Sequence, residues 1–180
     1  MDYSKIEADP VRGPEIGRMY EDASPFITTL ARVAYGQFAD QVREQYCELV
    51  KEVRVIFTED DPYGSASEMF ESVRRGTLCI YSTPEDHRHP LLGCHGNDMF
   101  RAVHDYYGHF RSGRDFSRHG EEAAWVRHSQ MFTGLARRAM TSETRGQNSA
   151  FIWINGGRKF PEQKAVLLPD WVSRIPERWL

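Results

Sequence analysis

Two short strand-like segments constrain the fold most strongly, because they allow only a small sheet. Residues 53–60 (VRVIFTED) and 77–83 (TLCIYST) are rich in β-branched and aromatic side chains and are bounded by turn formers. Between them, residues 65–76 (SASEMFESVRRG) begin with a potential serine cap and end with glycine, which is typical of a short helix. We therefore expect a small sheet attached to helices.

Most of the remaining chain has helical periodicity. A long core-facing helix is expected from residues 23–30 (ASPFITTL) onward, with Ser24 as its N-cap and apolar residues at helical spacing as far as Leu49. A second helix is expected from Asn97 through residues 98–107 (DMFRAVHDYY), ending at the following glycine.

The C-terminal third of the chain contains one further strong helical pattern. From Gly120 or Glu121 to about Ala139, inward-facing residues follow steps of four and three. Residues 149–156 (SAFIWING) suggest an extended segment. The sequence therefore predicts one mostly helical α+β domain spanning residues 1–180, with a small sheet.

Composition and charge narrow the function classes. The chain has 180 residues, 40% of them hydrophobic, which fits one globular domain, and no linker divides it. With a net charge of -3 and scattered arginines, the chain has no positively charged patch that would attract nucleic acid. No apolar run approaches the roughly 18 residues of a membrane span, and residues 1–13 have no signal-peptide character. These features predict a soluble, cytoplasmic protein that binds neither nucleic acid nor membrane.

The histidines point to a metal site. All seven lie in one central segment: His87, His89, His95, His104, His109, His119 and His128. In residues 104–109 (HDYYGH) two of them stand five positions apart, about 140 degrees around a straight helix. If Gly108 ends the helix, His109 can turn back toward His104 and form a two-ligand clamp. The spacing and the absence of a glutamate between the histidines argue against an H-E-x-x-H zinc peptidase.

The third ligand must come from elsewhere in the chain. The two best candidates are Glu143, in the polar stretch of residues 141–148, and Glu121, on the inward face of the following helix. Two imidazoles and one carboxylate leave adjacent coordination positions open, an arrangement associated with non-haem Fe(II) and O₂. A helix C-terminus stabilised by His104 and His109 is the structural alternative to a metal site.

The string HDYYGH resembles the H-E-L-L-G-H metal-binding motif of the aromatic amino acid hydroxylases, and residues 110–125 resemble the loop and helix that follow it. Residues 81–90 are similar to the family's Tyr-Thr-Pro-Glu-Pro stretch, and residues 73–76 to its arginine-bearing segment. The resemblance covers residues 74–148 and implies a truncated hydroxylase-like catalytic core. No segment resembles the family's pterin-binding segment, so the resemblance does not extend to pterin dependence.

On this resemblance, the iron ligands would be His104, His109 and Glu143, and the candidate substrate contacts would be Arg74 and Thr83. The combination of residues 102–110, 120–125 and 143–148 also looks like proteins of bacteriophages and actinobacteria.

Several further side chains are candidates for supporting roles. Asp105 could orient a ligand histidine, and His128 could act as a ligand or as a base beside the site. Arg145 and Gln147 follow the preferred carboxylate and suit recognition of a polar or carboxylate substrate.

The favoured function is that of an Fe(II)-dependent monooxygenase, an oxidoreductase that uses O₂ on a small polar substrate, with amino-acid-like molecules among the candidates. A Zn²⁺-dependent hydrolase or lyase is the first alternative, with Glu121 or Glu122 as the base. A non-enzymatic binding or structural protein of phage type is the second.

Overall fold

In the computed structural model, which describes residues 1–180, the two strands and the helix between them form where the sequence predicts them. β1 (Arg54–Thr58) and β2 (Thr77–Tyr81) pair in parallel, with Arg54 opposite Thr77. α3 (Ala66–Arg74) makes the crossover, and the Ser65 hydroxyl accepts a hydrogen bond from the amide of Glu68, as an N-cap does. The sheet has two strands.

The long helix α2 begins later than predicted. It spans Thr29–Glu52, and the Thr28 hydroxyl caps it by accepting a hydrogen bond from the amide of Ala31. The hydroxyl of Ser24, the predicted cap, instead accepts from the amide of Phe26 within a local turn. The extended backbone of Thr28, with φ -71° and ψ 160°, is the conformation that an N-cap requires.

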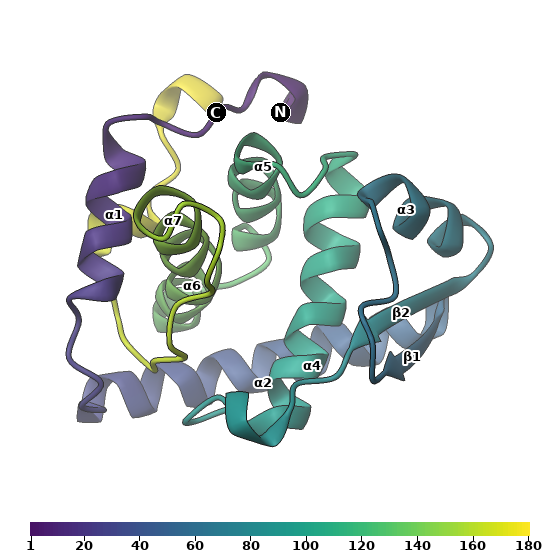
Figure 1. Cartoon of the computed structure of the whole chain (residues 1–180), viewed down its shortest axis with the longest axis horizontal. Coiled ribbons are helices and arrows are strands. Elements are labelled where there is room, and N and C mark those ends of the chain that lie inside the picture. The colour runs from purple at the N-terminus through teal and green to yellow at the C-terminus, as the bar shows by residue number, and fades with distance from the viewer.

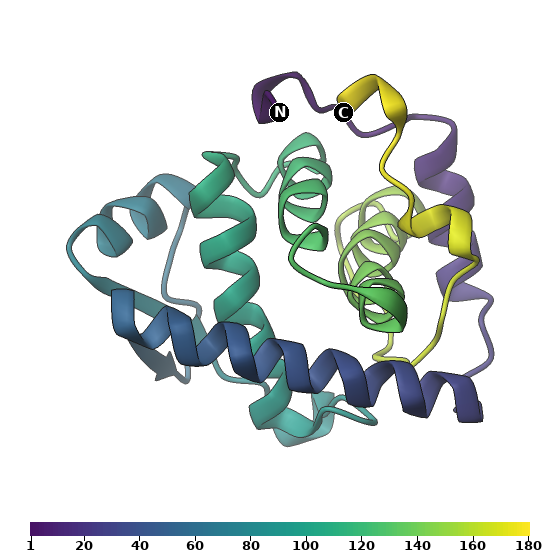
Figure 2. The same cartoon turned by 180° about the vertical axis from the view of Figure 1, so that it is seen from behind.

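α2 carries the core along one face. Phe38, Val42 and Leu49 are buried as their spacing predicts, whereas Leu30 and Val33 are each 48% exposed. The helix packs against α4 and α6. It runs behind α4 and below α6 in the view of Figure 1, and crosses in front of α4 in Figure 2. α2 therefore connects α4 and α6 through its buried face.

The second predicted helix is longer at both ends. α4 (Gly93–Val103) starts before Asn97 and continues without interruption into a π-helical turn, His104–Phe110. The expectation that Gly108 ends this helix is wrong. Gly113, with φ +69°, follows the last helical residues and provides the left-handed conformation that ends a helix.

The predicted helix over residues 121–139 is two helices. α5 (Arg118–Ser129) ends before a short connection, and α6 (Gly134–Thr141) starts after Thr133, whose backbone is extended. The connection turns the chain because Gly134 has φ +55°, which side-chain-bearing residues rarely adopt.

α6 continues through further helical turns to residue 154, so residues 149–156 are helical for most of their length and not extended. In order, this stretch contains the π turn Ser142–Gly146, α7 (Gln147–Ser149) and the π turn Ala150–Ile154. It packs against α1 (Arg12–Glu21) so closely that a Cβ on Gly17 would lie 2.7 Å from the carbonyl oxygen of Ser149.

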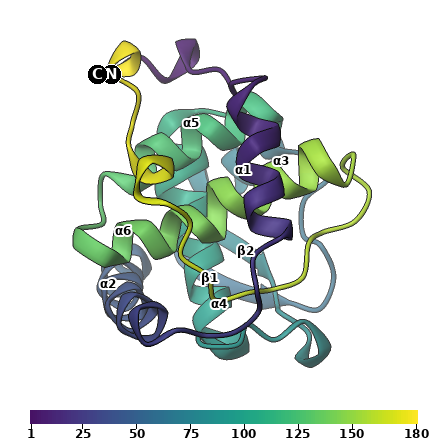
Figure 3. The same ribbon diagram turned by 90° about the vertical axis from the view of Figure 1, so that its left-hand side faces the viewer.

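The chain is 61% helical with a small parallel sheet, which confirms the predicted mostly helical α+β class. α1 lies at one end of the molecule and the sheet with α3 at the other (Figure 1), and the two termini lie side by side (Figures 1 and 3). An ion pair between Arg178 and Asp9, at 3.3 Å, joins the two terminal segments. None of the helices combines the length and the apolar character that crossing a membrane requires.

Candidate metal centre

A π turn brings the two predicted histidine ligands together. Hydrogen bonds from residue i to i+5 widen the turn, so that positions five apart lie on the same side. The amide of Arg111 donates to the carbonyl oxygen of Tyr106 in this pattern. The ring centres of His104 and His109 are 5.1 Å apart, with planes at 86°. The imidazoles converge as expected, but through a change of helical pitch and not through the end of a helix.

Gly108 has a different role from the one predicted. A Cβ at this position would lie 3.2 Å from the carbonyl oxygen of Ala124 in α5 and 3.2 Å from Nδ1 of His104. Glycine therefore allows α5 and the His104 ring to approach the same point of the turn. This close approach holds α5 beside the turn that carries the two histidines.

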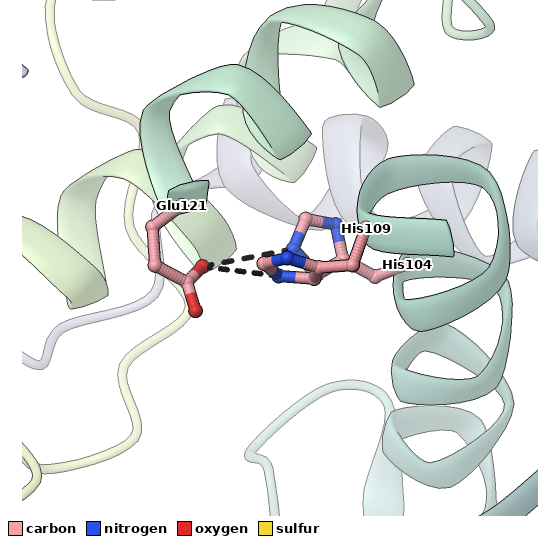
Figure 4. A group of neighbouring side chains, drawn as sticks. All are labelled: His104, His109 and Glu121. Carbon is pink, nitrogen blue, oxygen red and sulfur yellow. Dashed lines mark ion pairs between the residues drawn. The ribbon is translucent and has the colours of Figure 1, made fainter. Parts of the chain in front are cut away.

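Glu121 supplies a carboxylate from the first turn of α5. Its Oε2 lies 3.5 Å from Nε2 of His109 and 3.9 Å from Nε2 of His104 (Figure 4). One ligand atom from each of the three residues lies within 4.8 Å of the others. The amide of Asn148 donates to the same Oε2 at 2.5 Å and so fixes the carboxylate from α7.

The histidines are buried, and one nitrogen has no partner. His104 and His109 are 8% and 1% exposed, and Nε2 of His104 is buried without a hydrogen-bond partner. A buried polar atom left unpaired costs about 1–3 kcal/mol, so such an atom in a native protein requires an explanation. Metal bonds of about 2.0–2.2 Å would need the ligand atoms to close to about 3–3.5 Å, a small adjustment from the distances observed.

The charges on Glu121 and His109 stabilise each other. Burial opposes ionisation of Glu121, but His109 and His104 beside it lower its pKa to about 2. Burial likewise opposes the charge on His109, yet the Glu121 carboxylate raises the pKa of this imidazole to about 9. Without a metal, His109 and Glu121 therefore form an ion pair, and a metal cation would replace the imidazole proton.

Two other predicted residues lie at this centre. Asp105 stands on the same π turn, where burial raises its pKa although both histidines act in the opposite direction. His128, on α5, is fully buried, and its Nδ1 lies 3.2 Å from Nδ1 of His104. Burial, together with His104, holds the pKa of His128 well below its usual value. His128 therefore contacts a candidate ligand and is not itself in the three-residue group.

Glu143, the preferred carboxylate in the sequence, belongs to a second buried cluster formed by Tyr35, His89, Glu143 and Gln147. Its Oε1 accepts hydrogen bonds from the Tyr35 hydroxyl and, at 3.2 Å, from Nε2 of His89. Its Oε2 accepts from the Gln147 amide at 2.7 Å. The structure does not bring Glu143 to His104 and His109, and Glu121 occupies the position expected of the third ligand.

The predicted substrate contacts make internal hydrogen bonds. Arg145 forms a buried, two-pronged ion pair with Glu122 at 2.5 and 3.0 Å, and its guanidinium stacks 4.1 Å from the ring centre of Trp125. The second proton of the Gln147 amide goes to Gln163 at 3.0 Å. Arg145 and Gln147 thus connect parts of the protein and do not face the histidines.

Thr83 and Arg74 lie outside the centre as well. The Thr83 hydroxyl donates to Asp98 at 2.5 Å and accepts from Asn97 at 2.9 Å, which ties the segment after β2 to α4. Arg74 is exposed at the end of α3. Neither residue is joined to His104 or His109 by a hydrogen bond.

Sequence reasoning missed Gln45 and Asn148. Gln45 is 8% exposed, and its Oε1 lies 2.7 Å from Nε2 of His128. A signal for it existed, because position 45 falls between the buried residues Val42 and Leu49 on the apolar face of α2. Asn148 gave no such signal, since its contact with Glu121 joins helices that are distant in the sequence.

A small cavity adjoins the carboxylate. It has a volume of about 20 Å³, and its lining includes Glu121, Asn148, Arg118 and Trp153. A space of this size holds about one water molecule or another ligand of that size. The Arg118 guanidinium lies 5.4 Å from the ring centre of Trp153 at this cavity.

No family model matches the chain, and no curated protein or solved structure matches it either.

Proposed function

We propose that the protein binds one metal ion through His104, His109 and Glu121. The observation that carries this proposal is the buried, unpartnered Nε2 of His104, which faces a carboxylate oxygen and a second imidazole nitrogen. Two imidazoles and one carboxylate match the ligand types that bind Fe(II) and Zn²⁺. A metal ion would bind the lone pair of this nitrogen and so offset the free-energy cost of burying it without a hydrogen-bond partner.

We further propose that the metal is Fe(II) and that the activity is an O₂-dependent oxygenation of a small polar substrate. A bound Fe(II) would supply O₂ activation, and a two-histidine, one-carboxylate set leaves coordination positions open for it. In this proposal the Asn148 amide holds the Glu121 carboxylate in place by a hydrogen bond. The cavity that Glu121 helps to line has room for a molecule of the size of water.

The zinc hydrolase alternative needs a free general base. Glu122 is held by Arg145 in a buried ion pair, and Glu121 is assigned as a ligand. Neither of the two bases predicted from the sequence is therefore available to activate a water molecule. This observation favours the oxygenase over the hydrolase.

Metal analysis of protein purified without oxygen tests both the proposed ligands and the identity of the metal. We expect one iron per chain in the wild type and loss of metal in His104→Ala, His109→Ala and Glu121→Gln. Glu143→Gln is the matched control, because it changes a buried glutamate of the second cluster and should keep the metal. Metal retained in all three ligand variants would refute the site.

Oxygen uptake tests the chemistry separately. The iron-loaded wild type should consume O₂ in the presence of a reductant and small amino-acid-like compounds, and Glu121→Gln should not. Stoichiometric zinc in the native protein, without O₂ uptake on iron loading, would overturn the oxygenase and leave the metal site standing.

A further inference from the structure

We propose that Gln45 and His128 are positioning residues that fix the proton of His104 on Nδ1 and thereby keep its Nε2 open for a metal. The inference rests on the proposed metal site, and it concerns two residues outside the ligand set. The three side chains come from α2, α5 and the π turn, and they form one hydrogen-bonded row.

The row begins with the orientation of the Gln45 amide. Its Nε2 donates to the carbonyl oxygen of Met131 at 3.5 Å, so its Oε1 faces Nε2 of His128 at 2.7 Å. The opposite orientation would place Oε1 of Gln45 against the carbonyl oxygen of Met131, and neither atom has a proton to donate. Because an amide oxygen only accepts, the proton of His128 must lie on Nε2.

The second step follows from the surroundings of His128, whose two ring nitrogens contact Gln45 and His104 and no carboxylate that would balance a charge. The His128 ring is fully buried and stacks on Phe100 at 6.1 Å and 13° and on Tyr107 at 6.2 Å and 28°. A neutral imidazole with its proton on Nε2 has a lone pair on Nδ1. Nδ1 of His128 therefore accepts, and Nδ1 of His104, at 3.2 Å, must donate.

The third step places the open lone pair. With its proton on Nδ1, a neutral His104 has an unprotonated Nε2, the atom that is buried without a partner and faces Glu121. Neutral imidazole is the form that binds metals, and a partner on the other ring nitrogen sets the tautomer. The unpartnered nitrogen is thus the end of a row that starts 59 residues earlier, at Gln45.

His109 holds its Nδ1 proton by a local route. Its Nδ1 lies 3.0 Å from the carbonyl oxygen of Arg114, which can only accept. Both histidines therefore hold a proton on Nδ1 and turn Nε2 toward the same carboxylate oxygen. The Nδ1 proton of His109 is held by a backbone carbonyl of its own segment, whereas that of His104 is held by two side chains of other helices.

The test measures the tautomers directly in metal-free protein. Long-range proton–nitrogen NMR of ¹⁵N-histidine-labelled protein at pH 8 should show the proton of His104 on Nδ1 and that of His128 on Nε2. Gln45→Met keeps the size of the side chain but removes the acceptor, so His104 should become a mixture of tautomers. Gln41→Met, one turn earlier on α2, is the matched control and should leave the tautomers unchanged.

Zn²⁺ titration provides the second readout. Gln45→Met should weaken binding about 10- to 100-fold, as removal of a partner of a metal-ligating histidine typically does. A wild-type His104 with its proton on Nε2, or a Gln45→Met protein with unchanged tautomers and affinity, would overturn the inference. The predicted tautomers without any Zn²⁺ binding would instead refute the proposed function.

Discussion

The two buried histidine–glutamate clusters look alike in composition and differ in how completely their polar atoms are paired. In the second cluster His89 donates to Glu143 from Nε2, and its Nδ1 accepts from the amides of Leu91 and Leu92 at 3.1 and 2.9 Å. In the candidate metal centre His104 has a buried Nε2 with no partner. A fully paired network supports the fold, whereas an unpaired buried nitrogen marks a place for a ligand.

The largest expected effect is on stability and falls on the second cluster. Glu143→Ala would leave the donors of Tyr35, His89 and Gln147 without their acceptor. We expect it to lower the free energy of unfolding by about 3–5 kcal/mol, measured by urea denaturation. Metal affinity of the folded protein should not change. If Glu143→Ala lost metal and kept its stability, the assignment of roles to the two clusters would have to be reversed.

In the same experiment, added metal should stabilise the protein through the proposed metal site. A ligand that binds only the folded state at 100 times its Kd raises the free energy of unfolding by about 2.7 kcal/mol. We expect this gain in the wild type with Fe(II) or Zn²⁺ and its loss with a chelator. Glu121→Gln should show no gain and Glu143→Gln the full gain, and equal gains in both variants would contradict the comparison.

Gly108→Ala tests the packing that brings α5 to the histidines. The added methyl group would press on Ala124 and the His104 ring, and overpacking of this kind costs about 1–3 kcal/mol. Metal affinity should fall as well, because His104 must move. Gly36→Ala, where no atom lies within 4 Å, should instead stabilise α2 by about 0.5–1 kcal/mol. Unchanged stability and affinity in Gly108→Ala would refute the close contact.

The smallest effect, taken per pH unit, is the pH dependence of metal binding, at about 1.4 kcal/mol. The pKa of His109 is raised from 6.5 to about 9, so its ion pair with Glu121 stabilises the metal-free protein fully below pH 6.5 and is lost as the pH rises toward 9. A metal must displace this proton, so its affinity should rise about tenfold per pH unit over the same range. Metal titrations between pH 6.5 and 9 check this, and an affinity independent of pH would contradict it.

Much of the fold could be predicted from local patterns. The strands, the crossover helix and its serine cap depend on neighbouring residues, and they form where the sequence indicates. The division of the helix over residues 121–139 and the helical state of residues 149–156 could not be predicted in this way. The former depends on a glycine conformation, and the latter on packing against α1.

The candidate metal centre could be predicted in part. The spacing of His104 and His109, and the position of Glu121 on a helical face, single out all three residues of the group. The preference for Glu143 rests on a family resemblance and on position along the chain, neither of which reports tertiary contacts. Gln45 was missed because its partner is 83 residues away. Ligand types can be predicted from sequence, but the choice between two buried glutamates is decided by packing.

The π turn has a consequence for comparing this chain with others. A π turn is equivalent to one extra residue accommodated within an α-helix, so His104 and His109 hold the relation that positions i and i+4 have in a helix of ordinary pitch. A protein lacking one residue between these histidines could present them in the same arrangement. An alignment of the two would then need a single-residue gap inside a continuous helix, and a search restricted to one fixed spacing would separate proteins that build the same pair of ligands.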